Sequence, residues 1–536
     1  MGRHGGAVDR ARTTVAGVAV GLLVVAGVGG WQAWERLGPG AEPAAAAASC
    51  VDPTDVTVTT TTAMREPLEA VAGTLDRGCW KVTVTAEPAT TTARRFETAA
   101  ADTPDVWVAD SAPLAREVAA TSQGVSVGEV LASTPVLLAV PRGLTAPDPV
   151  TWAATLVAED SRMPDPTTST VGSLTLMEGF GEIDTLPANR RGGALARVGG
   201  MLSRVVPEDT LLTSHAGPGD AAIFPTTEQQ VYRAKVAGLT VRRATSTTPA
   251  LEYTAVTSAR TAPGAADALV AAARSAEGQR ILRAAGFRTR TDPSPVVEGA
   301  PPAAALAGAA GAAQAKAAQQ MWAAIARPTR LLNIIDTSGS MRAAAAGGAS
   351  RIEVAAAASS GANQLLADHN SVGLWTFSTR QRGRIDWTQV QPVRPLGSAD
   401  QRSRLAFSLG SLPTRLGGDT GLYDTVDAGY AAMVKGYDPQ AVNLMVLFTD
   451  GVNDDTSGGL SLAQLRSRLA KVADPKRPVT VLLIGLGGID AKTLGPVARA
   501  VPTAGGGGAA VFTVDRPEDI ADVYVTMLLR RLPQQR

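Results

Sequence analysis

Residues 331–341 read LLNIIDTSGSM, and this stretch decides the fold. Its first five residues form an apolar run of the kind found in a buried parallel strand, and the polar residues from Asp336 onward form a loop at the carboxyl end of that strand. Open parallel sheets bind ligands at this edge. The stretch therefore predicts an α/β sheet together with the position of its functional site.

Two further stretches are expected to deliver polar residues to the same edge. The apolar run 443–448 reads NLMVLF and ends in Thr449-Asp450-Gly451. Between the two runs, residues 417–424 are expected to form a glycine-rich loop that contains Thr420. This loop leads into an amphipathic helix that extends to Tyr437. Because the carboxyl ends of parallel strands meet at one edge of a sheet, these three loops offer oxygen ligands to a single site.

The three loops resemble the DxSxS, T and D elements of the metal-ion-dependent adhesion site of the von Willebrand factor A family, and the resemblance covers residues 330–536. The resemblance implies a divalent cation, Mg²⁺ with Mn²⁺ or Ca²⁺ as alternatives. Ser338, Ser340 and Thr420 would coordinate it through hydroxyls, while Asp336 and Asp450 would hold coordinated waters. The residues alone also allow a simpler interpretation, in which Asp336–Ser340 is a turn whose hydroxyls cap the next helix.

The chemistry of such a site indicates binding and not turnover, so no catalytic residue and no enzymatic activity are expected. Mg²⁺ is a hard, octahedral cation that keeps waters, which suits hydroxyl ligands backed by two outer carboxylates. Without a direct protein carboxylate, the cation can accept an acidic residue of a protein partner. Asp419, Asp454 and Asp455 lie close in sequence and either strengthen cation binding or remain solvated loop charges.

The rest of this region alternates strands with helices, which predicts a doubly wound, mostly parallel sheet. The expected strands are 372–379 and 479–484, and the expected helices are 351–368, 462–472, 491–500 and 518–532.

Residues 50–290 also alternate short apolar runs with Ala-rich helical stretches, which is typical of an α/β layered domain. Strands are expected at 56–60, 80–85, 104–110, 251–257 and the proline-bracketed run 135–141, and a long helix at 265–285.

This region resembles the type II periplasmic solute-binding fold, in which two α/β lobes joined by crossing strands close on a ligand. The resemblance implies a small-molecule ligand. Thr90–Thr92, before Arg94 and Arg95, either line the cleft and contact an anion or form an ordinary polar loop. The alternative is another kind of extracytoplasmic α/β domain. Residues 291–329, rich in Ala and Pro, are expected to be a linker that is partly helical at most.

No charged residue occurs from Thr13 to Trp34, a run that spans roughly 33 Å as a helix. Arginines precede this run, so we expect 1–12 in the cytoplasm, 13–34 as a single-pass membrane anchor, 35–49 as a tether and the bulk of the chain outside the cell membrane. A cleaved signal peptide is the alternative. Cys50 and Cys79 are expected to form a disulfide in that compartment, with two free thiols as the alternative.

The chain has 50 basic and 49 acidic residues, so it lacks the basic excess that is typical of a nucleic-acid-binding protein. Its length of 536 residues indicates two or three domains. The leading hypothesis is a membrane-anchored adhesion or binding protein that engages a protein partner through Mg²⁺. The alternative is a solute receptor of a transport system, with the C-terminal region as a docking accessory.

Overall fold

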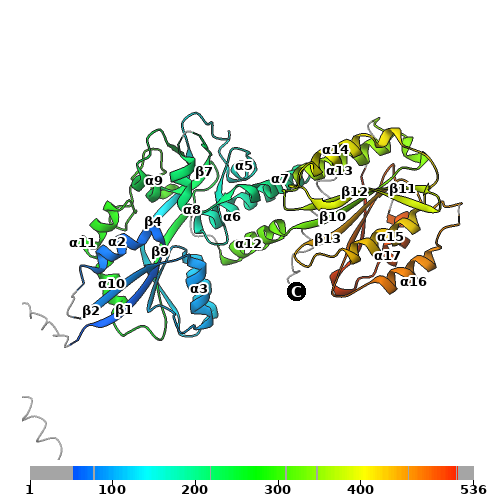
Figure 1. Ribbon diagram of the computed structural model, residues 1–536. Helices are drawn as coiled ribbons and strands as arrows, with labels where there is room; N and C mark the ends of the chain where they lie inside the picture. The colour runs from blue at the N-terminus through cyan, green and yellow to red at the C-terminus, as the bar shows by residue number, and fades with distance from the viewer. Residues whose placement is uncertain are drawn as a thin grey trace, which may run out of the picture. The chain divides into compact units, whose positions relative to one another are not determined.

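The computed structural model describes residues 52–75, 79–217, 219–307, 311–345, 348–456, 458–489, 491–514 and 516. The described part of the chain forms an N-terminal α/β domain followed by a C-terminal α/β domain (Figure 1). Each domain is built around its own sheet.

The sheet of the N-terminal domain has the strand order β2-β1-β3-β9-β4-β7, with β8 also paired to β4, within the described ranges. Strands β1, β2 and β3 run parallel, whereas β9, β7 and β8 form antiparallel ladders. The strands are β1 (Thr54–Thr60), β2 (Trp80–Ala86), β3 (Val106–Ala109), β4 (Ser126–Val140), β7 (Phe224–Thr227), β8 (Thr240–Arg242) and β9 (Ala250–Thr257), and a separate pair is β5 (Met163–Pro164) with β6 (Val205–Val206).

Strand β4 joins the two lobes of this domain. Its first part pairs with β9 of the first lobe as far as Pro135, and from Val136 it pairs with β7 of the second lobe. We expected a short strand bounded by Pro135 and Pro141, but β4 runs through Pro135 and is 15 residues long. The proline is tolerated because it lies where β4 changes partner, so its missing N–H interrupts neither ladder.

Helices cover both lobes, and their buried faces are built at helical spacing, as in α2 with Met64, Leu68 and Val71. The helices are α2 (Thr62–Ala72), α3 (Ala89–Thr98), α4 (Ala112–Thr121), α5 (Trp152–Val157), α6 (Thr170–Asp184), α7 (Ala188–Gly200), α8 (Glu208–Thr210), α9 (Glu228–Ala234), α10 (Ala265–Arg274), α11 (Ala276–Ala284) and α12 (Ala312–Ala326).

The expected single helix over 265–285 is wrong, because it is broken into α10 and α11 at Ser275. Ser275 has extended backbone angles (φ −62°, ψ 161°), and its hydroxyl accepts a hydrogen bond from the N–H of Gly278 at 3.0 Å. A side chain on Gly278 would lie 2.0 Å from the carbonyl oxygen of Ala272. The serine therefore ends one helix and caps the next, and the glycine lets the two pack closely.

The expected linker contains a packed helix, α12. Its residues Ala318, Trp322 and Ile325 are buried in one apolar cluster with side chains of α6 and α7. The spacing of these three residues places them on one face of the helix.

The C-terminal domain has the strand order β12-β11-β10-β13-β14-β15 within the described residues, and only β12 runs antiparallel to its neighbour. This arrangement confirms the prediction of a mostly parallel sheet. The strands are β10 (Thr329–Asp336), β11 (Ser371–Arg382), β12 (Ile385–Pro395), β13 (Val442–Thr449), β14 (Thr480–Gly485) and β15 (Gly508–Thr513).

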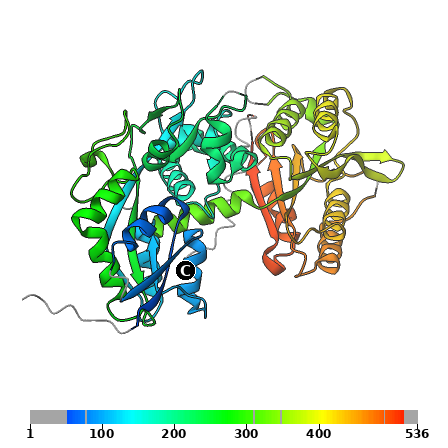
Figure 2. The same cartoon turned by 60° about the vertical axis from the view of Figure 1, so that its left-hand side comes forward.

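Helices lie on both faces of this sheet (Figure 2). Leu331 and Ile335 of β10 share an apolar cluster with residues of α13 and α14, whereas Leu332 and Ile334 on the other face share one with α15, α16 and α17. The alternation explains why β10 is apolar along its length. The helices are α13 (Arg351–Leu365), α14 (Gln401–Gly410), α15 (Leu422–Lys435), α16 (Leu462–Val472) and α17 (Ala491–Ala500).

Three expectations fall on residues outside the described ranges: the membrane span 13–34, Cys50 as the partner of Cys79, and the helix at 518–532. Among the residues that the structure does describe, no helix has the length and apolar character needed to cross a membrane. No described cysteine is a free thiol. The anchor and the Cys50–Cys79 pairing stay predictions.

Candidate functional site

The candidate metal centre lies at the carboxyl ends of β10 and β13. These strands are parallel neighbours, with Ile335 opposite Phe448, so the loops beginning at Asp336 and Asp450 leave the sheet side by side. The order of strands along the chain reverses between β10 and β13. Ligand sites of open α/β sheets lie at such a reversal.

Asp336 is fully buried and held by its neighbours. Its carboxylate accepts hydrogen bonds from the Ser338 N–H at 2.8 Å and from the Thr449 hydroxyl at 2.6 Å. Burial raises the pKa of Asp336 to about 6, while the hydrogen bonds from Ser338 and Thr449 act in the opposite direction. The carboxylate is thus oriented before any ligand binds.

The two serines and Asp450 form a connected group. The hydroxyl oxygens of Ser338 and Ser340 lie 3.1 Å apart, and the Ser340 hydroxyl donates to Asp450 Oδ1 at 2.8 Å. Ser338 precedes the short 3-10 helix Gly339–Arg342, and its side chain makes no capping hydrogen bond there. The capping interpretation of this serine is therefore wrong, and its hydroxyl lies next to that of Ser340 instead.

Thr420 reaches the same edge from the third loop. The backbones of Gly417 and Gly418 hydrogen-bond those of Thr337 and Gly339 at 2.9 and 3.0 Å. Thr420 is 5% exposed, and a side chain built on Gly451 would lie 3.6 Å from its hydroxyl oxygen. The structure thus brings together all five residues that the sequence indicated, which are Asp336, Ser338, Ser340, Thr420 and Asp450.

One cationic side chain at this edge was missed by sequence reasoning. Arg351, the first residue of α13, donates from Nη1 to Asp450 Oδ2 at 2.5 Å. A side chain on Gly487 would lie 2.2 Å from Arg351 Nε, so the glycine loop after β14 makes room for the guanidinium. The sequence carries no signal for this pair, because Arg351 reaches Asp450 only through the way α13 packs beside the sheet.

A second group of carboxylates lies nearby. Asp386, Asp424 and Asp455 each offer an oxygen within 4.8 Å of the others. Burial raises the pKa of Asp386; the Arg380 N–H hydrogen bond lowers it, and Asp455 and Asp424 raise it further. Sequence reasoning named Asp455 but missed Asp386, which lies on strand β12. The remaining extra aspartates, Asp419 and Asp454, are exposed loop charges.

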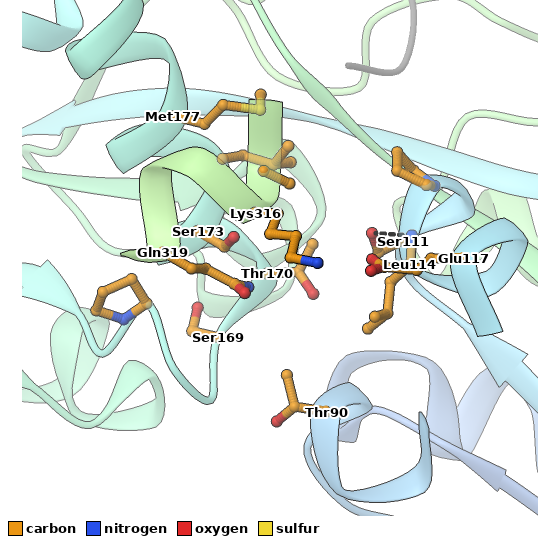
Figure 3. Close-up of a pocket in the computed structure, with 14 residues that line it drawn as sticks. Thr90, Ser111, Leu114, Glu117, Ser169, Thr170, Ser173, Met177, Lys316 and Gln319 are labelled. Carbon is orange, nitrogen blue, oxygen red and sulfur yellow. Dashed lines mark hydrogen bonds between the residues drawn. The ribbon is translucent and has the colours of Figure 1, made fainter. Parts of the chain in front are cut away.

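The N-terminal domain contains a pocket of about 70 Å³ between its lobes, lined by hydroxyl groups and by apolar side chains (Figure 3). Thr90 lines it, so of the two alternatives for Thr90–Thr92 the cleft-lining one holds for Thr90. The segment lies in helix α3 and does not form a loop. The first lobe also contributes Ser111, Leu114 and Glu117, the second lobe contributes Ser169, Thr170, Ser173 and Met177, and α12 contributes Lys316 and Gln319.

Two carboxylates hold the hydroxyls at the start of α6. Thr170 donates to Asp110 at 2.9 Å, which ties the second lobe to the end of β3 in the first lobe. Ser169 donates to Glu208, which also accepts from Gln230 at 2.6 Å. Burial raises the pKa of Asp110 to about 7 and raises that of Glu208. Sequence reasoning placed Asp110 only at the end of a strand and did not find this contact.

Comparisons with known families agree with the two-domain architecture. Residues 56–288 match the family model described as bacterial extracellular solute-binding protein. Residues 331–524 match the model of the von Willebrand factor type A domain. No curated protein matches the chain.

Several solved structures are similar to parts of the chain. A periplasmic thiamin binding protein is 14% identical with a TM-score of 0.40, over 51% of this chain and 96% of that protein. A von Willebrand factor type A protein from Catenulispora acidiphila is 19% identical with a TM-score of 0.28, over 38% of this chain and 42% of that one. A mutant of the PilB minor pilin from Streptococcus sanguinis is 15% identical with a TM-score of 0.30, over 38% of this chain and 61% of the pilin.

Proposed function

Because the chain joins a bacterial extracellular solute-binding domain to a von Willebrand factor type A domain, we propose that it is a membrane-anchored extracytoplasmic binding or adhesion protein. In this proposal the C-terminal domain binds a divalent cation, and the cation accepts an acidic residue of a protein partner. The proposal includes no catalytic step. The anchor is the segment 13–34, and the first lobe carries the disulfide between Cys50 and Cys79.

The observation that carries the proposal is the convergence of hydroxyls and carboxylates at the β10–β13 edge. Ser338, Ser340 and Thr420 would hold Mg²⁺ through their hydroxyl oxygens, and the oxygens of the two serines are already 3.1 Å apart. Asp336 and Asp450 would act through bound waters. This donor set fits Mg²⁺, which prefers oxygen ligands and keeps part of its hydration shell. When bound, the cation would supply a positive charge with an open position for a carboxylate.

An apolar side chain beside the centre supports a protein as the partner. Val452 follows Gly451 in the loop after β13 and is 56% exposed. In many protein interfaces an apolar side chain becomes buried next to a specific polar contact. Val452 would be that apolar side chain, and the cation would make the polar contact.

The pocket of the N-terminal domain supports a second candidate function, that of a solute receptor. Its lining combines hydroxyl groups of both lobes with apolar side chains such as Leu114 and Met177, which suits a small molecule that has both polar and apolar parts. In that case the C-terminal domain would dock the receptor to another protein.

The proposal is tested by affinity capture of partners from membranes with the full chain, with and without EDTA. We expect partners to be lost on chelation and in Asp336→Ala, and to be retained in Asp419→Ala, the matched control for an exposed aspartate beside the same site. Capture that survives both chelation and Asp336→Ala would refute metal-bridged binding. Isothermal titration of the full chain with metabolite pools tests the receptor function, which predicts tight small-molecule binding that Asp336→Ala leaves unchanged.

A further inference from the structure

Helix α12 has two different faces, and both contact the N-terminal domain. One face buries Ala318, Trp322 and Ile325 in the apolar cluster formed with α6 and α7 of the second lobe. Lys316 and Gln319, in the first half of the helix, line the pocket between the lobes. The same helix is therefore packed on the second lobe and forms a wall of the space between the lobes.

The opposite wall of the pocket belongs to the first lobe. Leu114 and Glu117 of α4 lie there together with Thr90 of α3. Figure 3 shows the side chain of Lys316 extending from α12 into the pocket toward the side of Ser111. A solute in this pocket would have to share the space with Lys316 and Gln319.

The chain itself also satisfies the polar groups at the start of α6. The Thr170 hydroxyl proton is donated to Asp110 and the Ser169 proton to Glu208. The Thr170–Asp110 bond links the two lobes directly at 2.9 Å. The cleft is thus closed by the chain's own contacts without any solute.

We propose that α12 is a strap that holds the two lobes closed, so that a solute enters the pocket only after the first half of α12 has moved away. The strap is also the element that joins the two domains, because only Arg327 and Pro328 separate α12 from β10. This proposal does not depend on a metal ion in the C-terminal domain.

The sequence of α12 makes its first half the releasable part. The buried residues there are small, Ala315 partly and Ala318 almost completely, whereas the second half is anchored by Trp322 and Ile325. Since the stabilisation gained on burial grows with apolar area, the alanines hold the first half less strongly than Trp322 holds the second. Local opening is expected to begin at the weakly held end.

The test measures access to the pocket in the full chain. Ser173, which lines the pocket, is replaced in Ser173→Cys, and the rate at which N-ethylmaleimide labels this position is followed by peptide mass spectrometry. Ala318→Glu puts a charge into the buried face of α12 and should release the strap. Ala317→Glu is the matched control, because Ala317 is the exposed neighbour on the same helix.

We expect labelling about tenfold faster in Ala318→Glu, and an unchanged rate in Ala317→Glu. Equal rates in all three backgrounds would overturn the proposal, and so would equal acceleration by both glutamates. If Ala318→Glu does not fold, Ala318→Gly decides the question, because it weakens the helix in its first half and leaves the pocket-lining side chains Lys316 and Gln319 in place. Labelling about threefold faster in Ala318→Gly would support the strap, and an unchanged rate would overturn it.

Discussion

The two domains place carboxylates beside serine and threonine hydroxyls in different ways. In the N-terminal domain the Thr170 hydroxyl is bound to Asp110, whose pKa burial raises to about 7, so this group tends to hold a proton. In the C-terminal domain the hydroxyls of Ser338 and Ser340 lie together next to Asp450. In the N-terminal domain, an aspartate and a hydroxyl therefore bind each other and link the two lobes. In the C-terminal domain, the same side-chain types form a candidate cation site at the edge of the sheet.

The largest expected effect concerns the fully buried ion pair of the N-terminal domain. Arg288 donates to Glu228 at 2.6 and 3.1 Å, and both side chains are at most 1% exposed. Arg288→Met leaves the glutamate charge buried without its partner, so we expect the free energy of unfolding in urea to fall by about 3–5 kcal/mol. The double variant with Glu228→Gln removes both charges and should lose less. A double variant as unstable as the single one would contradict this account.

The second effect concerns Asp110 and the pH. The pKa of this group is raised by burial from 3.8 to about 7, so the folded protein holds the proton more tightly than the unfolded chain does. Its contribution to stability is therefore complete below about pH 4 and is lost as the pH rises from about 4 through 7, by roughly 4 kcal/mol.

Asp110→Asn removes this dependence. In urea titrations we expect the free energy of unfolding of the original protein to fall relative to that of the variant between pH 4 and pH 8. The difference, variant minus original, should therefore increase. Asp102→Asn, at an exposed aspartate shortly before the same strand, is the control and should give no such increase. A difference that stays constant with pH would show that Asp110 is ionised throughout, and the contrast between the two domains would disappear.

The third effect tests the candidate cation site. Ser340→Ala removes one hydroxyl and the hydrogen bond to Asp450, so we expect Mg²⁺ affinity, measured by isothermal titration, to fall about 10- to 100-fold. Thr414→Ala, at an exposed threonine of the same domain, should bind Mg²⁺ like the original protein. If the serine variant binds equally well, the hydroxyl group at the β10–β13 edge is not the site.

The smallest effect concerns Arg351. Its guanidinium lies against Asp450 and adds a positive charge beside the site. In Arg351→Gln that charge no longer competes with a divalent cation, so we expect about threefold tighter Mg²⁺ binding in the same titration. Arg404→Gln, on the exposed side of α14, should have no effect. Weaker binding in Arg351→Gln would mean that the arginine positions Asp450 for the ion and does not oppose it.

The sequence by itself determined the parallel sheet and the five residues at its edge. Strands buried on both faces are apolar along their length, so the runs that end at Asp336 and Thr449 were visible directly. Parallel strands end at one edge, and this geometry brings together loops that are 113 residues apart without any knowledge of the packing.

Only the tertiary structure decided the contacts that depend on how helices pack. Nothing local in the sequence links Arg351 to Asp450, Asp386 to Asp424, or Asp110 to Thr170. The alanines of α12 show no strong apolar period, so that segment was expected to be a linker, although Trp322 and Ile325 bury one face of it. The break at Ser275 was likewise hidden, because Ala-rich residues on both sides favour a helix. The cap at Ser275 and the close packing at Gly278 separate α10 from α11.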